Sequence, residues 1–285
     1  MTADARPAHD IRLIATDLDG TLLRNDKSVS PRTVAALAAA EEAGIDVFFV
    51  TGRPARWMDV VRSHVHGHGL AICANGAAVV DLHRGGRMLE CHALSPKDAL
   101  AVVTALRAAA PGCSFAADCV DTVHHEPDYP PFHEEPCATV GPVEKLLTGE
   151  GPAVATAAHQ PEQPLLKLLA HHPTLEPDTF LALARAEAGA HATFTRSSPS
   201  ALLEISARGV SKAATLARCC AARGISRSQV LAFGDMPNDL EMLTWAGTSY
   251  AMANAHPDVL AATTHRTASN EDDGVAVAIE ALLAS

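Results

Sequence analysis

The stretch IRLIATDLDGT, residues 11–21, begins as an apolar run and ends in two aspartates, a glycine and a threonine. A short apolar run of this kind is typical of a buried strand in a parallel sheet. Open α/β sheets bind their ligands beyond the carboxyl ends of their strands, so Asp17 and Asp19 are expected at a ligand-binding edge. Two carboxylates this close repel each other, which favours a divalent cation between them. Gly20 allows the backbone to bend sharply at this point.

Other apolar segments repeat this arrangement of a strand that ends in polar residues. Residues 45–50 lead to Thr51, residues 70–74 lead to an Asn-Gly turn, and residues 229–233 lead to Asp235. Helical segments are expected between these strands, for example after the Ser-Pro pair at residues 30–31. Alternating strands and helices predict an α/β protein with a Rossmann-like core built on a parallel sheet.

The middle of the chain has a different character. Residues 125–136 are too rich in proline for regular structure, and helical segments and short strand candidates surround them. The strand–helix alternation resumes only after residue 200. We therefore expect an inserted α+β domain at 83–199, which divides a core made of residues 1–82 and 200–285.

Composition excludes several classes of protein. The 285 residues carry 22 Lys and Arg against 33 Asp and Glu, a net charge of −11 that argues against nonspecific nucleic-acid binding. The seven cysteines form no C-x-x-C pair, so neither a zinc site nor a disulfide framework is indicated. Residues 1–10 lack the apolar segment of a signal peptide, and no uncharged run is long enough to cross a membrane. We expect a cytoplasmic protein with no nucleic-acid or membrane partner, and its oligomeric state is left open.

Several polar residues are expected to meet at the carboxyl edge of the sheet. Carboxylate oxygens of this kind suit a hard cation, with Mg²⁺ the first expectation. A lysine and a threonine hydroxyl beside the cation can hold phosphoryl oxygens. The chain contains no Gly-rich nucleotide-binding loop and no G-x-S-x-G serine nucleophile. The residues expected to converge are Asp17, Asp19, Thr51, Lys212, Asp235 and Asp239.

These residues also carry a resemblance to a known family. DLDGT (17–21), TGR (51–53), Lys212 and GDMPND (234–239) resemble the four ordered motifs of the haloacid dehalogenase-like phosphatases. ANGA (74–77) and NEDDGVA (270–276) narrow the resemblance to the Cof-like subgroup, whose α/β cap is inserted after the third strand. The resemblance covers nearly all of the core and is weak through the cap.

The resemblance implies a role for each acidic residue. Asp17 would be the nucleophile that forms an aspartyl-phosphate, and Asp19 would be the general acid and then the general base. The carboxylates of Asp17 and Asp235, with the backbone carbonyl of Asp19, would hold magnesium. Asp239 would support the waters on the metal or orient Lys212. An acid two residues after the nucleophile speaks against a dehalogenase.

The resemblance also implies a set of residues around the phosphoryl group. Thr51 and Lys212 would bind the transferring phosphoryl group and count with the aspartates as catalytic. Arg53 either contacts the substrate or forms a surface salt bridge, and Lys167 on a cap strand is expected to be structural. The residues expected to bind phosphate or substrate are Thr51, Gly52, Arg53, Lys212 and Asn238.

The favoured function is magnesium-dependent hydrolysis of small phosphomonoesters, such as sugar phosphates or similar metabolites. Two alternatives remain open on the same scaffold. The first is a phosphotransferase or phosphomutase, which would pass the phosphoryl group to a second hydroxyl instead of water. The second is a non-catalytic phosphate-binding regulator, for which a pair of aspartates at positions 17 and 19 would be unnecessary. The substrate itself is expected to be a small phosphorylated metabolite chosen by the cap.

Overall fold

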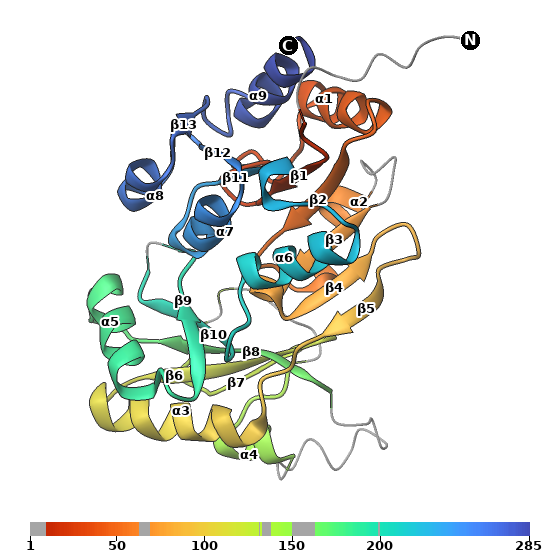
Figure 1. Cartoon of the computed structure of the whole chain (residues 1–285). Helices are drawn as coiled ribbons and strands as arrows, with labels where there is room; N and C mark the ends of the chain where they lie inside the picture. The colour runs from red at the N-terminus through yellow and green to blue at the C-terminus, as the bar shows by residue number, and fades with distance from the viewer. Residues whose placement is uncertain (1–9, 63–68, 131, 133–137, 150–162, 199) are drawn as a thin grey trace.

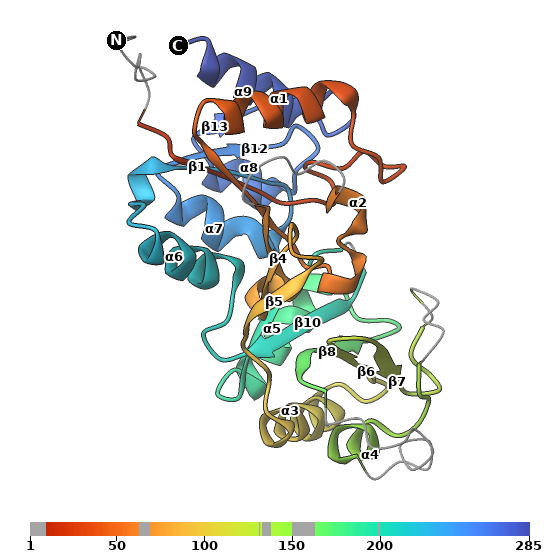
Figure 2. The same ribbon diagram turned by 90° about the vertical axis from the view of Figure 1, so that its right-hand side faces the viewer.

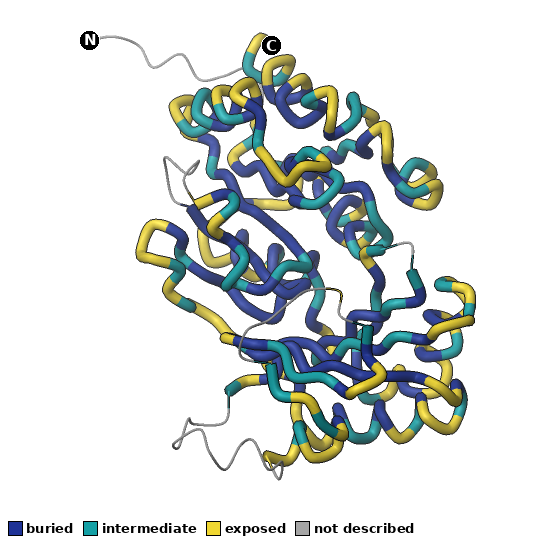
Figure 3. The backbone as a smooth tube through the Cα atoms, turned by 180° about the vertical axis from the view of Figure 1, so that it is seen from behind, coloured by how far each residue is buried: buried dark blue, intermediate teal, exposed yellow. Residues whose placement is uncertain are grey.

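The computed structural model of the chain describes residues 10–62, 69–130, 132, 138–149, 163–198 and 200–285. The strands form two sheets, and the smaller sheet lies below the larger one in Figure 1. Most strands of both sheets run through the buried interior of the molecule, while exposed residues gather on the outer helices, the turns and the edge strands of the larger sheet (Figure 3). Within the described ranges, no helix combines the length and the apolar character needed to cross a membrane.

The larger sheet has the order β13-β12-β11-β1-β2-β3-β4-β5. Its strands are parallel from β13 to β3, whereas β4 and β5 continue the sheet as an antiparallel hairpin. The expected parallel α/β core is therefore confirmed. Its strands are β1 (Leu13–Thr16), β2 (Asp46–Val50), β3 (Leu70–Cys73), β4 (Ala78–Asp81), β5 (Arg87–Cys91), β11 (Val230–Gly234), β12 (Thr248–Ala251) and β13 (His265–Arg266).

Helices cover both faces of the larger sheet. Figure 2 shows α1 and α9 together on one side of it, with α6 and α7 on the other. Ser30 caps α1 by accepting a hydrogen bond from the backbone amide of Thr33, and Pro31 occupies its first position. The helices are α1 (Pro31–Glu42), α2 (Asp59–Arg62), α6 (Lys212–Ala222), α7 (Leu240–Trp245), α8 (Pro257–Ala262) and α9 (Gly274–Leu283).

The smaller sheet is antiparallel throughout and has the order β7-β6-β8-β10-β9. In Figure 1, α3 and α4 lie beneath it, on the side away from the larger sheet, and α5 packs against α3. Its strands and helices are β6 (Ser114–Cys119), β7 (Val123–His125), β8 (Leu165–His171), β9 (Ala192–Thr195), β10 (Leu202–Ala207), α3 (Pro96–Ala109), α4 (Val143–Thr148) and α5 (Pro177–Ala188).

Alternation along the strands gives the smaller sheet two different faces. Leu168 and Ala170 of β8 belong to the hydrophobic core shared with α3 and α5. Lys167 and Leu169, which point the opposite way, line a cavity that also contacts the larger sheet. One face of the sheet therefore stabilises the fold, and the other is available to a ligand.

The expected limits at 82/83 and 199/200 do not coincide with the change from one sheet to the other. β5 still belongs to the larger sheet, because its hairpin with β4 extends that sheet by one more strand. β10 belongs to the smaller sheet, because it pairs with both β8 and β9. The smaller sheet and its helices lie between the end of β5 and the end of β10, residues 92–207, and we call this segment the insert.

Candidate active site

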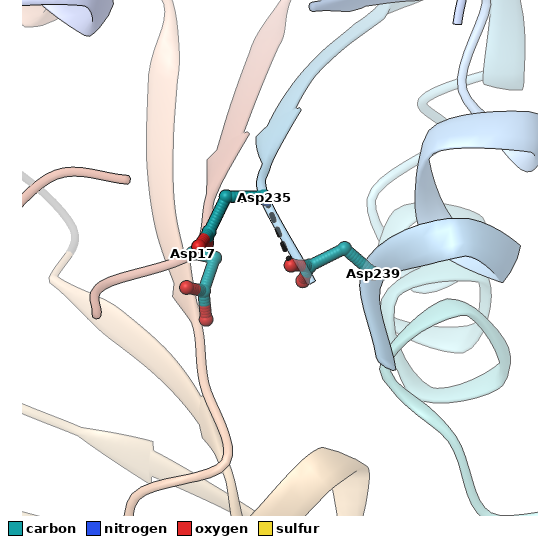
Figure 4. A group of neighbouring side chains, drawn as sticks. All are labelled: Asp17, Asp235 and Asp239. Atoms are coloured by element: carbon teal, nitrogen blue, oxygen red, sulfur yellow. Dashed lines mark hydrogen bonds between the residues drawn. The ribbon is translucent and has the colours of Figure 1, made fainter. Parts of the chain in front are cut away.

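Three aspartates gather at the carboxyl edge of the larger sheet. Asp17 follows β1, Asp235 follows β11, and Asp239 ends the short turn before α7. Their side chains converge in Figure 4, and carboxylate oxygens from all three lie within 4.8 Å of one another. Gly20 makes this convergence possible, since its φ is +78° and a Cβ there would lie 2.2 Å from an Asp235 oxygen.

Lys212, at the start of α6, is the cation of this cluster. Its Nζ donates to Asp17 Oδ1 at 2.5 Å and to Asp239 Oδ1 at 2.7 Å, and the side chain is 1% exposed. The other Asp239 oxygen accepts hydrogen bonds from the backbone amides of Asp235 and Met236. Asp239 therefore has both oxygens engaged and is placed to orient Lys212, whereas Asp17 and Asp235 each keep lone pairs for another ligand.

The electrostatics of the cluster fit a divalent cation. Burial raises the pKa of Asp17 well above its usual value, although Lys212 opposes the shift. Burial and the charge of Asp239 raise the pKa of Asp235 to about 7. Three carboxylates against one ammonium leave a formal charge of minus two, which one divalent cation neutralises. The all-oxygen donor set suits a hard ion.

The carboxylate of Asp19 lies apart from this cluster. It accepts hydrogen bonds from Arg53, at 2.5 Å to Nε and 2.7 Å to Nη2, and from Lys27 Nζ at 2.8 Å. Burial alone would raise the pKa of Asp19, but the hydrogen bonds from Arg53 and Lys27 lower it to about 2. Arg53 thus forms an ion pair with Asp19 among the residues that line the cavity. No sequence motif pointed to Lys27, which sits in a turn at a φ of +68°.

Thr51 and Asn238 lie at the same edge. Thr51 follows β2, is 1% exposed, and its hydroxyl accepts a hydrogen bond from the backbone amide of Arg53. Asn238 Nδ2 donates to Asn75 Oδ1 at 3.1 Å, and Asn75 Nδ2 donates in turn to Glu204 Oε2 at 2.8 Å. Asn238 Oδ1 is buried and has no hydrogen-bond partner among the described residues. It is therefore an acceptor available to a ligand.

The insert adds a second buried lysine, which the sequence had suggested was only structural. Lys167 Nζ donates to the carbonyl of Gly52 at 2.8 Å and to Glu204 Oε2 at 2.6 Å. Its contact with Gly52 joins the insert to the loop that carries Thr51 and Arg53. A lysine inside the apolar run LLKLLA was the one sequence signal of this role, because a lysine on a buried strand needs a partner.

A further ion pair crosses between the same two parts. Arg56, in the turn after β2, lies 3.0 Å from Asp118 Oδ1 on β6 and donates to the backbone carbonyl of Cys119. The other Asp118 oxygen lies 3.6 Å from Lys167 Nζ. Neither Arg56 nor Asp118 belongs to a motif, so no pattern in the sequence pointed to them.

A cavity of about 980 Å³ lies where the insert faces the larger sheet. Asp17, Asp19 and Thr51 line one part of it, so the buried acids open onto a space large enough for a small metabolite. Lys167, Asp118 and Glu204 also contribute to the lining. Its apolar lining residues include Trp57, Val123, Tyr129, Pro130, Phe132, Ala138, Leu169, Leu202 and Met236.

Comparison with known proteins gives a consistent picture. The chain is 29% identical over 274 residues to the 5-amino-6-(5-phospho-D-ribitylamino)uracil phosphatase YitU of Bacillus subtilis. The matched region covers 93% of this chain and 94% of that protein. It is also 29% identical over 270 residues to the pyridoxal phosphate phosphatase YbhA of Escherichia coli, covering 93% of this chain and 96% of that protein.

The fold is shared with solved structures. The phosphatase BT1666 of Bacteroides thetaiotaomicron superposes with a TM-score of 0.77 at 22% identity, covering 99% of this chain and 97% of that one. A profile of haloacid dehalogenase-like hydrolases matches residues 14–279, which include both halves of the larger sheet and the whole insert. The chain therefore belongs to the haloacid dehalogenase-like hydrolase family.

Proposed function

We propose that the protein is a magnesium-dependent phosphatase that hydrolyses small phosphomonoesters through an aspartyl-phosphate on Asp17. The observation that carries this proposal is the position of Asp17, which is buried beside Lys212 and two further aspartates yet lines the cavity. Relatives named as phosphatases of a ribitylaminouracil phosphate and of pyridoxal phosphate support the reaction class. We further propose a cytoplasmic enzyme whose substrate is a small phosphorylated metabolite.

In the first half-reaction a carboxylate oxygen of Asp17 attacks phosphorus, and the bond between phosphorus and the ester oxygen breaks. Lys212 and the Thr51 hydroxyl are placed to hold phosphoryl oxygens, with Asn238 nearby. Magnesium would be held by the carboxylates of Asp17 and Asp235 and by the backbone carbonyl of Asp19, and would neutralise charge on the phosphoryl group.

Asp19 has the proton-transfer role in this scheme. It gives a proton to the leaving alkoxide, and in the second half-reaction it takes a proton from the water that attacks the aspartyl-phosphate. In the structure its carboxylate is held by Arg53 and Lys27. Both cations also line the cavity, so a phosphate dianion entering it competes with Asp19 for them. Once the phosphate takes these two cations, the hydrogen bonds that lower the pKa of Asp19 are lost. The pKa of Asp19 then rises, and its carboxylate takes up the proton from solvent that it passes to the leaving alkoxide.

The substitution Asp19→Asn tests this assignment. An acidic phenol leaves without a proton, so the variant should still phosphorylate Asp17 from an aryl phosphate when magnesium is present. Without its base, the variant should accumulate the aspartyl-phosphate. The readout is a burst of phenol together with a phosphate-sized mass gain on the peptide that contains Asp17.

Asp17→Asn is the matched control, and it should show neither the burst nor the mass gain. A mass gain on another peptide would refute Asp17 as the nucleophile. If Asp19→Asn binds magnesium normally but gives no burst, the proton-transfer role of Asp19 is wrong. Transfer of labelled phosphate to an added sugar instead of water would identify a phosphotransferase.

A further inference from the structure

The cavity concentrates a residue type that is scarce in this chain. Aromatic residues make up only 4% of the sequence, as seven Phe, two Tyr and two Trp. Six of the seven phenylalanines are buried in the two hydrophobic cores. The seventh, Phe132, is 40% exposed and lines the cavity, together with Tyr129 and Trp57. All six other phenylalanines lie in the two cores, so this exposed ring needs a reason outside fold stability.

The rings on the insert are fixed in place by one another. The ring centroid of Phe132 lies 5.6 Å from that of Tyr129 and 5.6 Å from that of His171, both in edge-on contact. The ring of His125 lies 6.1 Å from that of Tyr129. These spacings are in the range of favourable aromatic pairs. Phe132 is therefore held on two sides while part of its surface stays open to a ligand.

Several polar groups that the insert contributes to the cavity are already paired, whereas Asn238 Oδ1 from the core is an acceptor without a partner among the described residues. Lys167 binds Glu204 and the Gly52 carbonyl, and the hydroxyl of Ser197 donates to Glu204. The carboxylate of Asp118 is paired with Arg56. A free sugar buried here would need partners for several hydroxyls, and each hydroxyl left unpaired would weaken binding. An apolar, flat group makes no such demand.

We propose that the rings of His125, Tyr129 and Phe132, which we call the aromatic wall, bind a planar aromatic or heteroaromatic group on the alcohol part of the substrate. The preferred substrates are then phosphomonoesters that carry such a ring, and sugar phosphates without one are poorer. This inference rests on the proposed phosphatase function. It concerns the selection of the leaving group and not the chemistry at phosphorus.

The test compares benzyl phosphate with cyclohexylmethyl phosphate. Both release a primary alcohol of similar size, so they differ mainly in whether the six-membered ring is flat and aromatic. We expect kcat/KM to favour benzyl phosphate by roughly 2- to 10-fold, the range that a favourable ring pair provides. Phe132→Ala should bring the ratio close to one and lower kcat/KM for benzyl phosphate more than for cyclohexylmethyl phosphate.

Leu89→Ala is the matched control, because Leu89 is an exposed apolar residue on β5 that does not line the cavity. It should leave the ratio unchanged. Tyr129→Phe removes only a hydroxyl and should also preserve the ratio, since it keeps the ring. Equal kcat/KM for the two esters in the unmodified enzyme would overturn the inference and leave the phosphatase function standing.

A binding measurement separates failure of the inference from failure of the proposed function. Benzylphosphonate and cyclohexylmethylphosphonate cannot be hydrolysed, and their dissociation constants can be measured by calorimetry with magnesium present. Tighter binding of benzylphosphonate that is lost in Phe132→Ala would support the aromatic wall. It would do so even if neither ester were hydrolysed, whereas that lack of hydrolysis would refute the phosphatase function. Equal binding of the two phosphonates would overturn the aromatic wall whatever the enzyme hydrolyses.

Discussion

The two buried lysines of this protein, Lys212 and Lys167, have similar surroundings and different consequences. Both side chains are almost fully buried, and each ammonium lies next to two carboxylates. Lys212 sits among Asp17, Asp239 and the nearby Asp235, where negative charge is in excess. Lys167 has the positively charged Arg56 beside it, so Asp118 and Glu204 are balanced by two cations.

The two clusters therefore differ in their balance of charges, although each lysine is buried and lies next to two carboxylates. The pKa values agree with this reading. Burial and neighbouring carboxylates raise the pKa values of Asp17 and Asp235 around Lys212. Around Lys167, burial would raise the pKa of Glu204, but the lysine outweighs it and the pKa is lowered. The first cluster needs a further cation, and the second is complete as it stands.

Lys212→Met should have the largest effect, because it removes the one ammonium from three buried carboxylates. We expect kcat to fall by about 10²–10³-fold, the usual loss when a preorganised group that stabilises the transition state is deleted. Without magnesium the unfolding free energy should fall by about 3–5 kcal/mol, since buried charges lose their partner. Kinetics and urea unfolding measure these two quantities.

Lys212→Arg serves as the control, because it keeps the charge but changes the geometry. It should recover stability more fully than kcat. An unchanged kcat in Lys212→Met would show that Lys212 only packs against the acids, and the contrast between the two lysines would disappear.

Lys167→Met should destabilise the protein about as much as Lys212→Met does, since the buried carboxylate of Glu204 would lose its ammonium partner. Its effect on catalysis should be much smaller, about tenfold in kcat/KM and mainly in KM, because Lys167 touches the Gly52 carbonyl and not Asp17. The double variant Lys167→Met/Glu204→Gln should be more stable than Lys167→Met alone, because it removes the unpaired charge. A loss of kcat as large as that of Lys212→Met would contradict the contrast.

The sequence was sufficient to predict that the residues around Lys212 lie close together. It was not sufficient to predict the partners of Lys167. Asp17, Asp235 and Lys212 follow strands or start a helix at the same sheet edge, so topology alone brings them together. Glu204 and Gly52 lie 37 and 115 residues from Lys167, and only the packing of the insert on the core makes them neighbours. The pattern and spacing of residues along the chain do not indicate contacts between residues this far apart.

The dependence on contacts between distant residues also explains the other differences between the sequence-based expectations and the structure. The expected limits at 82/83 and 199/200 differ from the change of sheet at β5 and β10, because sheet membership depends on hydrogen bonds to other strands and not on local pattern. Phe132 lies in a proline-rich segment without periodicity, so nothing local marked it as a cavity residue. The parallel core was predictable because each of its strands repeats one local pattern.

Magnesium should stabilise the Lys212 cluster and have no direct effect on the Lys167 cluster. A cation at one hundred times its dissociation constant adds about 2.7 kcal/mol to the free energy of unfolding. We expect an increase of this size in the unmodified protein and in Lys167→Met. Asp235→Asn should show little of it, because a carboxylate ligand is lost.

Titration with magnesium during urea unfolding measures this difference.

Calcium should also stabilise the protein but support little turnover, because it takes longer bonds and more ligands than in-line transfer tolerates. Full turnover in the presence of a chelator would refute the metal requirement.

The smallest effect should come from the pair of amides that runs from the turn carrying Asp239 to Glu204 in the Lys167 cluster. From Asn238 a hydrogen bond runs to Asn75 and another from Asn75 to Glu204, the partner of Lys167. Asn238→Ala should cost about 1 kcal/mol in stability, the value of one neutral hydrogen bond. It should not add independently to Lys167→Met in kcat/KM, because both changes act on the carboxylate of Glu204. A double-mutant cycle should give a coupling of about 0.5 kcal/mol or more. Leu89→Ala combined with Lys167→Met is the additive control. Strict additivity for Asn238→Ala as well would mean that the two lysine clusters act separately, and that the insert influences catalysis only through the Gly52 carbonyl and the shape of the cavity.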